Sequence, residues 1–250
     1  SFLKRLLYSI KFSDFKILFS SQIKNDSKLM YDRLISIIPR KIAPFLIYDK
    51  DPYLVLTDDG RLKWMMDAYT ISRYFPYSEP FNKKINYIRN TVKVVVDAYD
   101  GTIDFYIADK SDPIIQAYSS VYKGLFKPLD AMPRYMKQHV KYPKDLFTVQ
   151  ALMLNTYHME DPQVFYNRED LWEFPQETYE GSEKTMTPYY IVTKLPGETK
   201  ESFVLMLPFT PTNKNNMIAW LAASSDFDSY GDFTVLKLPK EKTIYGPMQI

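Results

Sequence analysis

The stretch KVVVDAYDGTIDFYIAD, residues 93–109, consists of two β-prone segments that meet at the dipeptide Asp100-Gly101. Val, Ile, Tyr and Phe favour extended backbone, and Asp-Gly accepts the positive backbone angles of a tight hairpin turn. A second stretch, PYLVLTDDGRLKWMMDAYT at residues 52–70, repeats this design around Asp59-Gly60. From Pro44 onward the sequence therefore predicts strands, folded into antiparallel hairpins.

The first hairpin carries four acidic residues, and their role bears directly on function. Asp100 is a turn residue, and charges on exposed strands commonly guard against edge-to-edge pairing. We therefore interpret Asp97, Asp104 and Asp109 as a solvated face. The alternative is a hydrolase: Asp97 and Asp104 would form a glycosidase-like carboxylate pair if the fold brought them within about 5 to 9 Å.

The middle third reads as helical. In SDPIIQAYSSVYKGLF, residues 111–126, Ser111 or Asp112 is a helix cap, Pro113 occupies the first helical position and Gly124 ends the helix. Residues 142–159 repeat the Pro-started pattern at Pro143, and residues 160–176 contain a shorter version.

The last third returns to strands at three segments. These are residues 188–196, 201–211 and 233–239. Residues 215–225, NNMIAWLAASS, are predicted to be a helix, and residues 175–187 an exposed loop without core residues. We expect an α+β fold, with an antiparallel or mixed sheet built from hairpins and a helical middle segment.

The N-terminal segment has a different character. Residues 1–22 place apolar side chains on one helical face with basic residues between them, which predicts one or two amphipathic helices. A second helix is predicted over residues 27–42, stopped by Pro39. The first 50 residues carry ten basic and four acidic side chains. This segment is interpreted either as a surface helix of its own domain or as an arm at a membrane surface.

Composition excludes several classes of protein. The 250 residues carry a net charge of +2, which gives no support for nucleic-acid binding. The absence of Cys excludes a disulfide framework and zinc-thiolate sites. The longest apolar runs are far shorter than the ~20 residues of a membrane-spanning helix. The chain opens on Ser1 and closes on YGPMQI, which suggests a piece of a longer protein.

Motifs for cofactor or metal chemistry are absent. His139 and His158 lie in separate segments without metal-binding spacing, and His158 is interpreted as a residue at a helix C-terminus. The acids of SSDFDSYGD, residues 224–232, only partly fit a calcium loop, so we interpret the segment as a turn. We expect no metal site, no cofactor and no catalytic residue.

The 21 Tyr residues are the remaining candidates for recognition. Aromatic faces near exposed loops can stack on sugars or peptides, and half-buried strands also favour Tyr. The candidate contact residues are Tyr69, Tyr74, Tyr77 and Tyr99. The alternative is that they are half-buried Tyr residues of a sheet.

Four long segments carry a family resemblance. They are residues 43–72, 86–115, 142–172 and 203–223, together with the closing YGPMQI. Through them the chain resembles the large soluble region of bacterial membrane proteins known as uncharacterised protein family zero-one-eight-two, over essentially its whole length. The resemblance implies a parent with several N-terminal transmembrane helices and more of the same domain beyond Ile250.

The resemblance also implies a domain organisation and a location. Residues 1–42 would be a basic amphipathic helical arm that follows a membrane span, and residues 43–250 an α+β soluble domain truncated at its C-terminal end. The domain would belong to the cell membrane and face outside the cytoplasm. The family supplies no activity, substrate or catalytic residue to transfer.

We therefore expect an envelope binding or assembly module, and the sequence favours a non-enzymatic role without deciding it. Two alternatives stay open: a soluble cap of a transporter or channel, and the carboxylate-pair hydrolase. The expected partners are the membrane portion of the parent chain and an anionic lipid or cell-wall polymer, with no nucleic acid. Homo-oligomerisation is left open.

Overall fold

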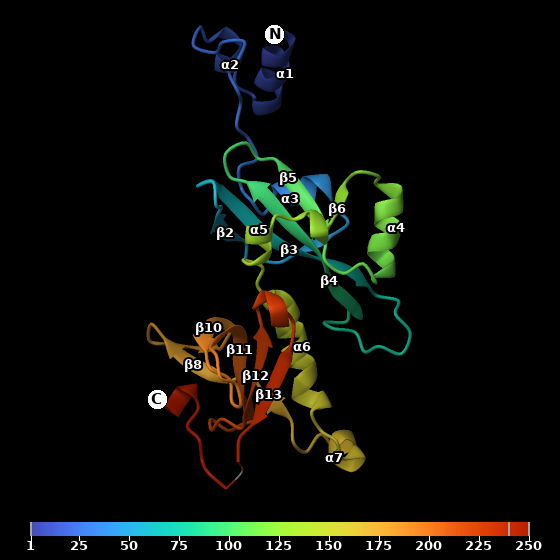
Figure 1. Cartoon of the computed structure of the whole chain (residues 1–250), viewed down its shortest axis with the longest axis vertical. Coiled ribbons are helices and arrows are strands. Elements are labelled where there is room, and N and C mark those ends of the chain that lie inside the picture. The colour runs from blue at the N-terminus through green and yellow to red at the C-terminus, as the bar shows by residue number, and fades with distance from the viewer. Residues whose placement is uncertain (1, 240, 250) are drawn as a thin grey trace. The chain divides into compact units, whose positions relative to one another are not determined.

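The computed structural model describes residues 2–239 and 241–249, which form two compact units, residues 1–34 and residues 35–250 (Figure 1). The first unit contains α1 (Phe2–Phe12) and α2 (Lys16–Phe19). The Asp14 carboxylate accepts a hydrogen bond from the backbone N–H of Lys16 at 2.9 Å, which fixes the turn between the two helices. The predicted pair of N-terminal helices is confirmed.

The predicted helix over residues 27–42 is wrong for most of its length. Residues 27–37 contain no helix, and α3 (Ile38–Ile42) is short. Pro39 lies in its first turn, so it starts this helix rather than stopping one, because proline lacks the N–H that the first turn leaves unpaired anyway. The Tyr48 hydroxyl donates to the carbonyl oxygens of Pro39 and Ala43 and so anchors α3 to β1 (Ile47–Tyr48).

The first sheet of residues 35–250 is built from the two predicted hairpins. Its strands are β1 (Ile47–Tyr48), β2 (Tyr53–Leu56), β3 (Leu62–Ser72), β4 (Tyr87–Asp97), β5 (Ile103–Ile107) and β6 (Phe126–Pro128). The order is β1-β3-β4-β5-β6, with β2 also paired to β3; only β5 and β6 are parallel. Gly60 and Gly101 have φ of +78° and +72°, as the two predicted Asp-Gly turns require.

Helices follow the hairpins of the first sheet. They are α4 (Pro113–Val121), η1 (Leu129–Ala131), α5 (Arg134–Lys137), α6 (Lys144–Tyr157) and α7 (Pro162–Asn167). Helix α4 lies between β5 and β6, and the others lead to the second sheet. Asp112 caps α4 as predicted, because its carboxylate accepts from the backbone N–H of Ile114 at 3.1 Å. That carboxylate is buried and also accepts hydrogen bonds from the hydroxyl groups of Thr70, Tyr87 and Thr91.

The second sheet follows the helices. It contains β7 (Trp172–Glu173), β10 (Tyr189–Thr193), β11 (Ser202–Pro211), β12 (Ala219–Ser224) and β13 (Phe233–Lys237). The order is β10-β11-β12-β13, all antiparallel, and β7 pairs with β11. A separate exposed hairpin, β8 (Gln176–Tyr179) with β9 (Ser182–Thr185), occupies the segment predicted to be a loop. Two short turns, η2 (Phe227–Ser229) and η3 (Pro247–Gln249), complete the chain.

One prediction in this sheet is wrong. Residues 215–225 were expected to be helical, and their centre is instead strand β12. Five of its six residues are buried, between β11 and β13 on its edges and the core on its face. Alanine favours helices in isolation, but tertiary packing overrides such a preference, since small side chains also fit a crowded central strand.

The main core lies where α6 packs against both sheets. Phe147 and Ala151 of α6 lie in one cluster with Leu205 and Phe209 of β11 and with Tyr69 of β3. Figure 1 shows α6 running beside the strands of the second sheet. The predicted α+β class is confirmed. Among the residues that the structure describes, no helix combines the length and apolar character needed to cross a bilayer.

Candidate binding sites

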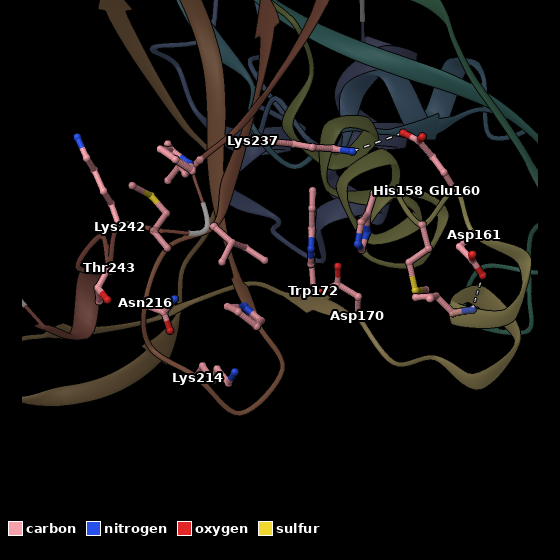
Figure 2. Close-up of a pocket in the computed structure, with 17 residues that line it drawn as sticks. His158, Glu160, Asp161, Asp170, Trp172, Lys214, Asn216, Lys237, Lys242 and Thr243 are labelled. Atoms are coloured by element: carbon pink, nitrogen blue, oxygen red, sulfur yellow. Dashed lines mark hydrogen bonds and ion pairs between the residues drawn. The ribbon is translucent and has the colours of Figure 1, made fainter.

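The best-formed pocket lies beside the end of α6 and has a volume of about 520 Å³ (Figure 2). Three stretches far apart in the sequence contribute lining residues: residues 158–172, residues 211–218, and residues 237–239 with 242–243. The pairing of Pro211 with Trp172 in β11 and β7 joins the first two stretches. The volume falls within the range of small-molecule sites.

The third stretch is held in place by the chain that follows it. The backbone N–H of Met217 donates to the carbonyl oxygen of Ile244 at 2.9 Å. Gly246 approaches so closely that a Cβ atom there would lie 2.0 Å from the carbonyl oxygen of Asn215, so only glycine fits. This contact sets the position of Lys242 and Thr243 at the pocket wall.

An aromatic stack forms one side of the pocket. The rings of His158 and Trp172 lie 3.6 Å apart between centroids, at 15° to each other, and Phe209 packs on Trp172 at 5.4 Å. His158 is the C-cap residue of α6, as the sequence predicts. Its contact with Trp172 was not predicted, because only the path of the chain through α7 and β7 brings the two residues together.

The hydrogen bond of His158 defines its tautomer. Nδ1 lies 2.9 Å from the carbonyl oxygen of Leu154. A carbonyl can only accept, so we assign the proton to Nδ1. Nε2 is buried and makes no hydrogen bond with any residue that the structure describes.

The charges around the pocket are separated. Figure 2 shows Lys214, Asn216, Lys242 and Thr243 on one side, across from His158 and Asp161. On the His158 side the acids are engaged: Glu160 lies 3.6 Å from Lys237, and Asp161 caps α7 through the N–H groups of residues 163 and 164. Within the described residues, Lys214 and Lys242 form no ion pair, so this side carries available positive charge.

A second feature is the loop of residues 73–86, between β3 and β4. The Asn86 side chain closes it by accepting from the N–H of Phe75 at 3.0 Å and donating to the carbonyl oxygen of Phe75 at 2.7 Å. Tyr74 is 84% exposed and Tyr77 is fully exposed. A mainly apolar groove of about 900 Å³ lies under the loop, between its basic residues and three Ile side chains of the sheet: Ile47, Ile71 and Ile88.

The four candidate Tyr residues fall into three places. Tyr74 and Tyr77 share the loop of residues 73–86. Tyr99 is exposed at the Asp100-Gly101 turn, with the Arg61 guanidinium 5.0 Å from its ring centroid. Tyr69 is only 1% exposed and its hydroxyl donates to Asp49 in the core, so the structure does not support it as a surface contact residue.

The candidate carboxylate pair is engaged in structural contacts. The Arg61 guanidinium donates to both carboxylate oxygens of Asp97 at 2.9 Å, and the backbone N–H of Tyr99 also donates to this carboxylate. Burial would raise the pKa of Asp97, but these hydrogen bonds outweigh it and lower the pKa. Asp104 pairs with Lys127 at 2.6 Å. Each acid therefore has its own cation, and Asp97 acts as a turn anchor.

The predicted turn at residues 224–232 is also built on structural contacts. Asp226 accepts a hydrogen bond from the backbone N–H of Phe203 at 3.1 Å, which ties the turn to β11. No group of three or more acidic or His side chains in the described part of the chain could hold a metal ion.

The whole chain, residues 1–250, matches the family described as Uncharacterised protein family (UPF0182). The chain belongs to this family. The family resemblance drawn from the sequence is thereby confirmed.

Relatives in the UPF0182 family come from diverse microbes. A UPF0182 protein of Pelotomaculum thermopropionicum is 56% identical over 250 residues, all of this chain and 27% of that protein. Those of Desulforamulus reducens and Microcystis aeruginosa are 51% and 50% identical over 251 residues each, covering 100% and 99% of this chain and 27% and 26% of those proteins. The chain thus spans about a quarter of their length. No solved structure matches it.

A buried ion pair in this UPF0182 chain escaped sequence reasoning. The ammonium group of Lys93 on β4 contacts the Asp67 carboxylate on β3, and both side chains are buried. Asn90 donates to the same carboxylate at 3.0 Å, and Lys93 donates to the Tyr230 hydroxyl at 2.5 Å. The available signal was a lysine within a run of valines, at the position where the neighbouring strand carries an acid.

Proposed function

We propose that this UPF0182 chain is the extracytoplasmic domain of a bacterial membrane protein, and that it works as a binding module at the anionic surface of the cell envelope. The membrane context rests on the family resemblance and on the fact that the chain covers only about a quarter of its relatives. The binding role rests on one observation, the composition and exposure of the loop of residues 73–86.

That loop combines the two side-chain types that suit a membrane surface. Tyr74 and Tyr77 project without packing partners in the core, and amphipathic aromatic rings partition to the headgroup region. Three basic residues, Arg73, Lys83 and Lys84, stand against one acid, Glu79. Within the described residues, none of the three basic side chains forms an ion pair. Each is free to approach a lipid phosphate.

The helical arm supports the same setting independently. In α1, the exposed apolar side chains of Phe2, Leu3, Leu7 and Ile10 alternate with Lys4, Arg5 and Lys11. A short helix of this composition is typical of segments that lie in the plane of a bilayer surface.

The test is co-sedimentation of the chain with vesicles of phosphatidylglycerol and phosphatidylcholine, compared with phosphatidylcholine alone. Each basic residue near an anionic surface contributes about 1 kcal/mol, so Lys83→Gln with Lys84→Gln should weaken binding about 30-fold. Tyr74→Ser with Tyr77→Ser should weaken binding to the same vesicles.

Matched controls lie elsewhere on the surface. Tyr166 is 87% exposed, and Lys194 and Lys200 are exposed lysines outside the loop. Tyr166→Ser and the pair Lys194→Gln with Lys200→Gln should leave binding unchanged. If the loop variants bind as well as these controls, the proposal fails. If the chain binds a polyglycerol-phosphate polymer and ignores vesicles, the partner is a cell-wall polymer.

The apolar face of α1 also favours a second candidate function, the soluble cap of a transporter or channel. In that case the arm docks on the membrane portion of the parent protein rather than on lipid. A cysteine introduced as Leu7→Cys should then react with a maleimide in the isolated chain but be protected in the full-length protein. A cysteine at the exposed position Tyr166 should react in both. Equal labelling at Leu7 in both proteins would contradict the cap.

A further inference from the structure

We infer that the pocket beside α6 binds a small organic anion, a molecule with a carboxylate or phosphate group attached to an apolar body. This site is distinct from the loop of residues 73–86 and does not depend on the function proposed for that loop.

The first argument is how firmly the pocket is built. Trp172 packs against both His158 and Phe209, and its strand, β7, is paired with β11. The opposite wall is fixed by the close approach of Gly246 to the backbone of Asn215. A pre-formed cavity of about 520 Å³ needs little ordering when a ligand enters.

The second argument is the distribution of charge in the pocket. On the α7 side, Glu160 is paired with Lys237, and Asp161 accepts hydrogen bonds from the first turn of α7. Lys214 and Lys242, across the pocket, form no ion pair with any described residue. Asn216 and Thr243 beside them add neutral hydrogen-bond donors (Figure 2). Asp170 also lines the pocket and has an interaction partner of its own. On the Lys214 side the available groups are cations and hydrogen-bond donors, which recognise an anion.

The third argument is the apolar lining. Met217, Ile218 and Leu238 also line the pocket. An inorganic ion would leave this surface in contact with water, whereas an organic anion covers it. A ligand with an aromatic or branched body next to its anionic group fits both features.

The chain offers a specific probe of this site, because it contains only two His residues. His158 lines the pocket, while His139 lies in the segment after α5 and contacts the carbonyl oxygen of Tyr135. Both imidazoles use Nδ1 toward a backbone carbonyl four residues earlier, so they are matched. Their nitrogen signals in NMR spectra report on the pocket and on a reference position in one sample.

The experiment is a titration of the chain with phenyl phosphate, benzoate and benzyl alcohol, followed by the imidazole signals. Phenyl phosphate or benzoate should move the His158 signals and leave those of His139 in place, and the neutral alcohol should bind more weakly. Whichever anion binds more tightly identifies the ligand as a phosphate or a carboxylate. The double variant Lys214→Gln with Lys242→Gln loses charged hydrogen-bond donors to the ligand. It should therefore bind the anions about tenfold more weakly, or weaker still.

The matched control is Lys194→Gln with Lys200→Gln, which removes the same charge from exposed positions away from the pocket. Its affinity for the probes should equal that of the unaltered chain. The inference is overturned if no anion moves the His158 signals, if benzyl alcohol binds as tightly as the anions, or if the Lys214 and Lys242 variant keeps full affinity. Each outcome is separate from vesicle binding, which the loop of residues 73–86 would govern.

Discussion

Asp67 and Asp112 are two buried carboxylates beside the same pair of strands, β3 and β4, and the protein accommodates them differently. Asp67 has an opposite charge, Lys93, as its main partner. Asp112 has no cation in contact among the described residues and accepts hydrogen bonds from three hydroxyl groups and one backbone N–H. The first arrangement buries two charges, and the second buries one.

The pKa values move in opposite directions. Burial raises the pKa of Asp67, with Lys93 opposing the shift. Burial acts the same way on Asp112, but its hydrogen bonds outweigh it and lower the pKa. A set of neutral donors can therefore hold a buried carboxylate in its charged form without a second buried charge.

The largest effect is expected at the ion pair. Asp67→Ala leaves the Lys93 ammonium group buried without its counter-charge, so the free energy of unfolding should fall by about 3 to 5 kcal/mol. Urea unfolding at neutral pH measures the loss.

The control for this variant removes both charges. Asp67→Leu with Lys93→Met replaces the pair by apolar side chains, and it should be more stable than Asp67→Ala. If the double variant is as unstable as Asp67→Ala, the loss of stability comes from packing and not from an unpaired charge. The contrast drawn between Asp67 and Asp112 would then not hold.

A smaller effect is expected at Asp112. Asp112→Asn keeps the shape but replaces one accepting oxygen by an amide nitrogen, so some of the hydroxyl and N–H donors lose their acceptor. The expected loss is about 1 to 3 kcal/mol, measured by urea unfolding at neutral pH. Thr148→Val, which removes a hydroxyl bonded only to a carbonyl within α6, is a control for the general cost of one such bond.

The lowered pKa of Asp112 adds a dependence on pH. In the unfolded chain its carboxyl group titrates near the ordinary value of 3.8, and in the folded chain below it. The stabilisation is therefore complete above the ordinary pKa and is lost as the pH falls through the folded value. The difference in stability between the unaltered chain and Asp112→Asn should narrow below about pH 4. A difference that stays constant down to acid unfolding would contradict the lowered pKa.

The smallest effect is expected at Asp97, where the cation is partly exposed to water. Arg61→Gln removes the two-oxygen contact but leaves the Tyr99 N–H on the carboxylate. Solvent and salt screen such a contact, so the melting temperature should change less than in Asp112→Asn, and the change should shrink at high salt. A larger change than in Asp112→Asn would show that this surface pair is a main anchor of the hairpin.

Local signals account for the parts of the fold that the sequence predicts correctly. The Asp-Gly turns and the Asp112-Pro113 start of α4 depend on backbone geometry that a few adjacent residues determine. The failures at β12 and around Pro39 have the opposite origin. Alanine-rich segments and proline positions fit two local structures, and neighbours distant in sequence select between them.

The candidate sites show the same limit. The exposure of Tyr74 and Tyr77 could be predicted, because they stand in a loop between two clear strands. Tyr69 could not be separated from them, because its burial depends on Asp49 and on α6. The pocket could not be predicted at all, since His158, Lys214 and Lys242 come together only through the pairing of β7 with β11 and the approach of the last residues.

Helix α6 has a consequence for how residues 35–250 lose their structure. It shares one apolar cluster with Tyr69 and Ile71 of the first sheet and with Leu205 and Phe209 of the second, so exposing this cluster disturbs both sheets. The two sheets should therefore behave as one cooperative unit, with similar protection of β3 and β11 amides against hydrogen exchange. Weakening the contact of α6 with one sheet would lower the protection of both.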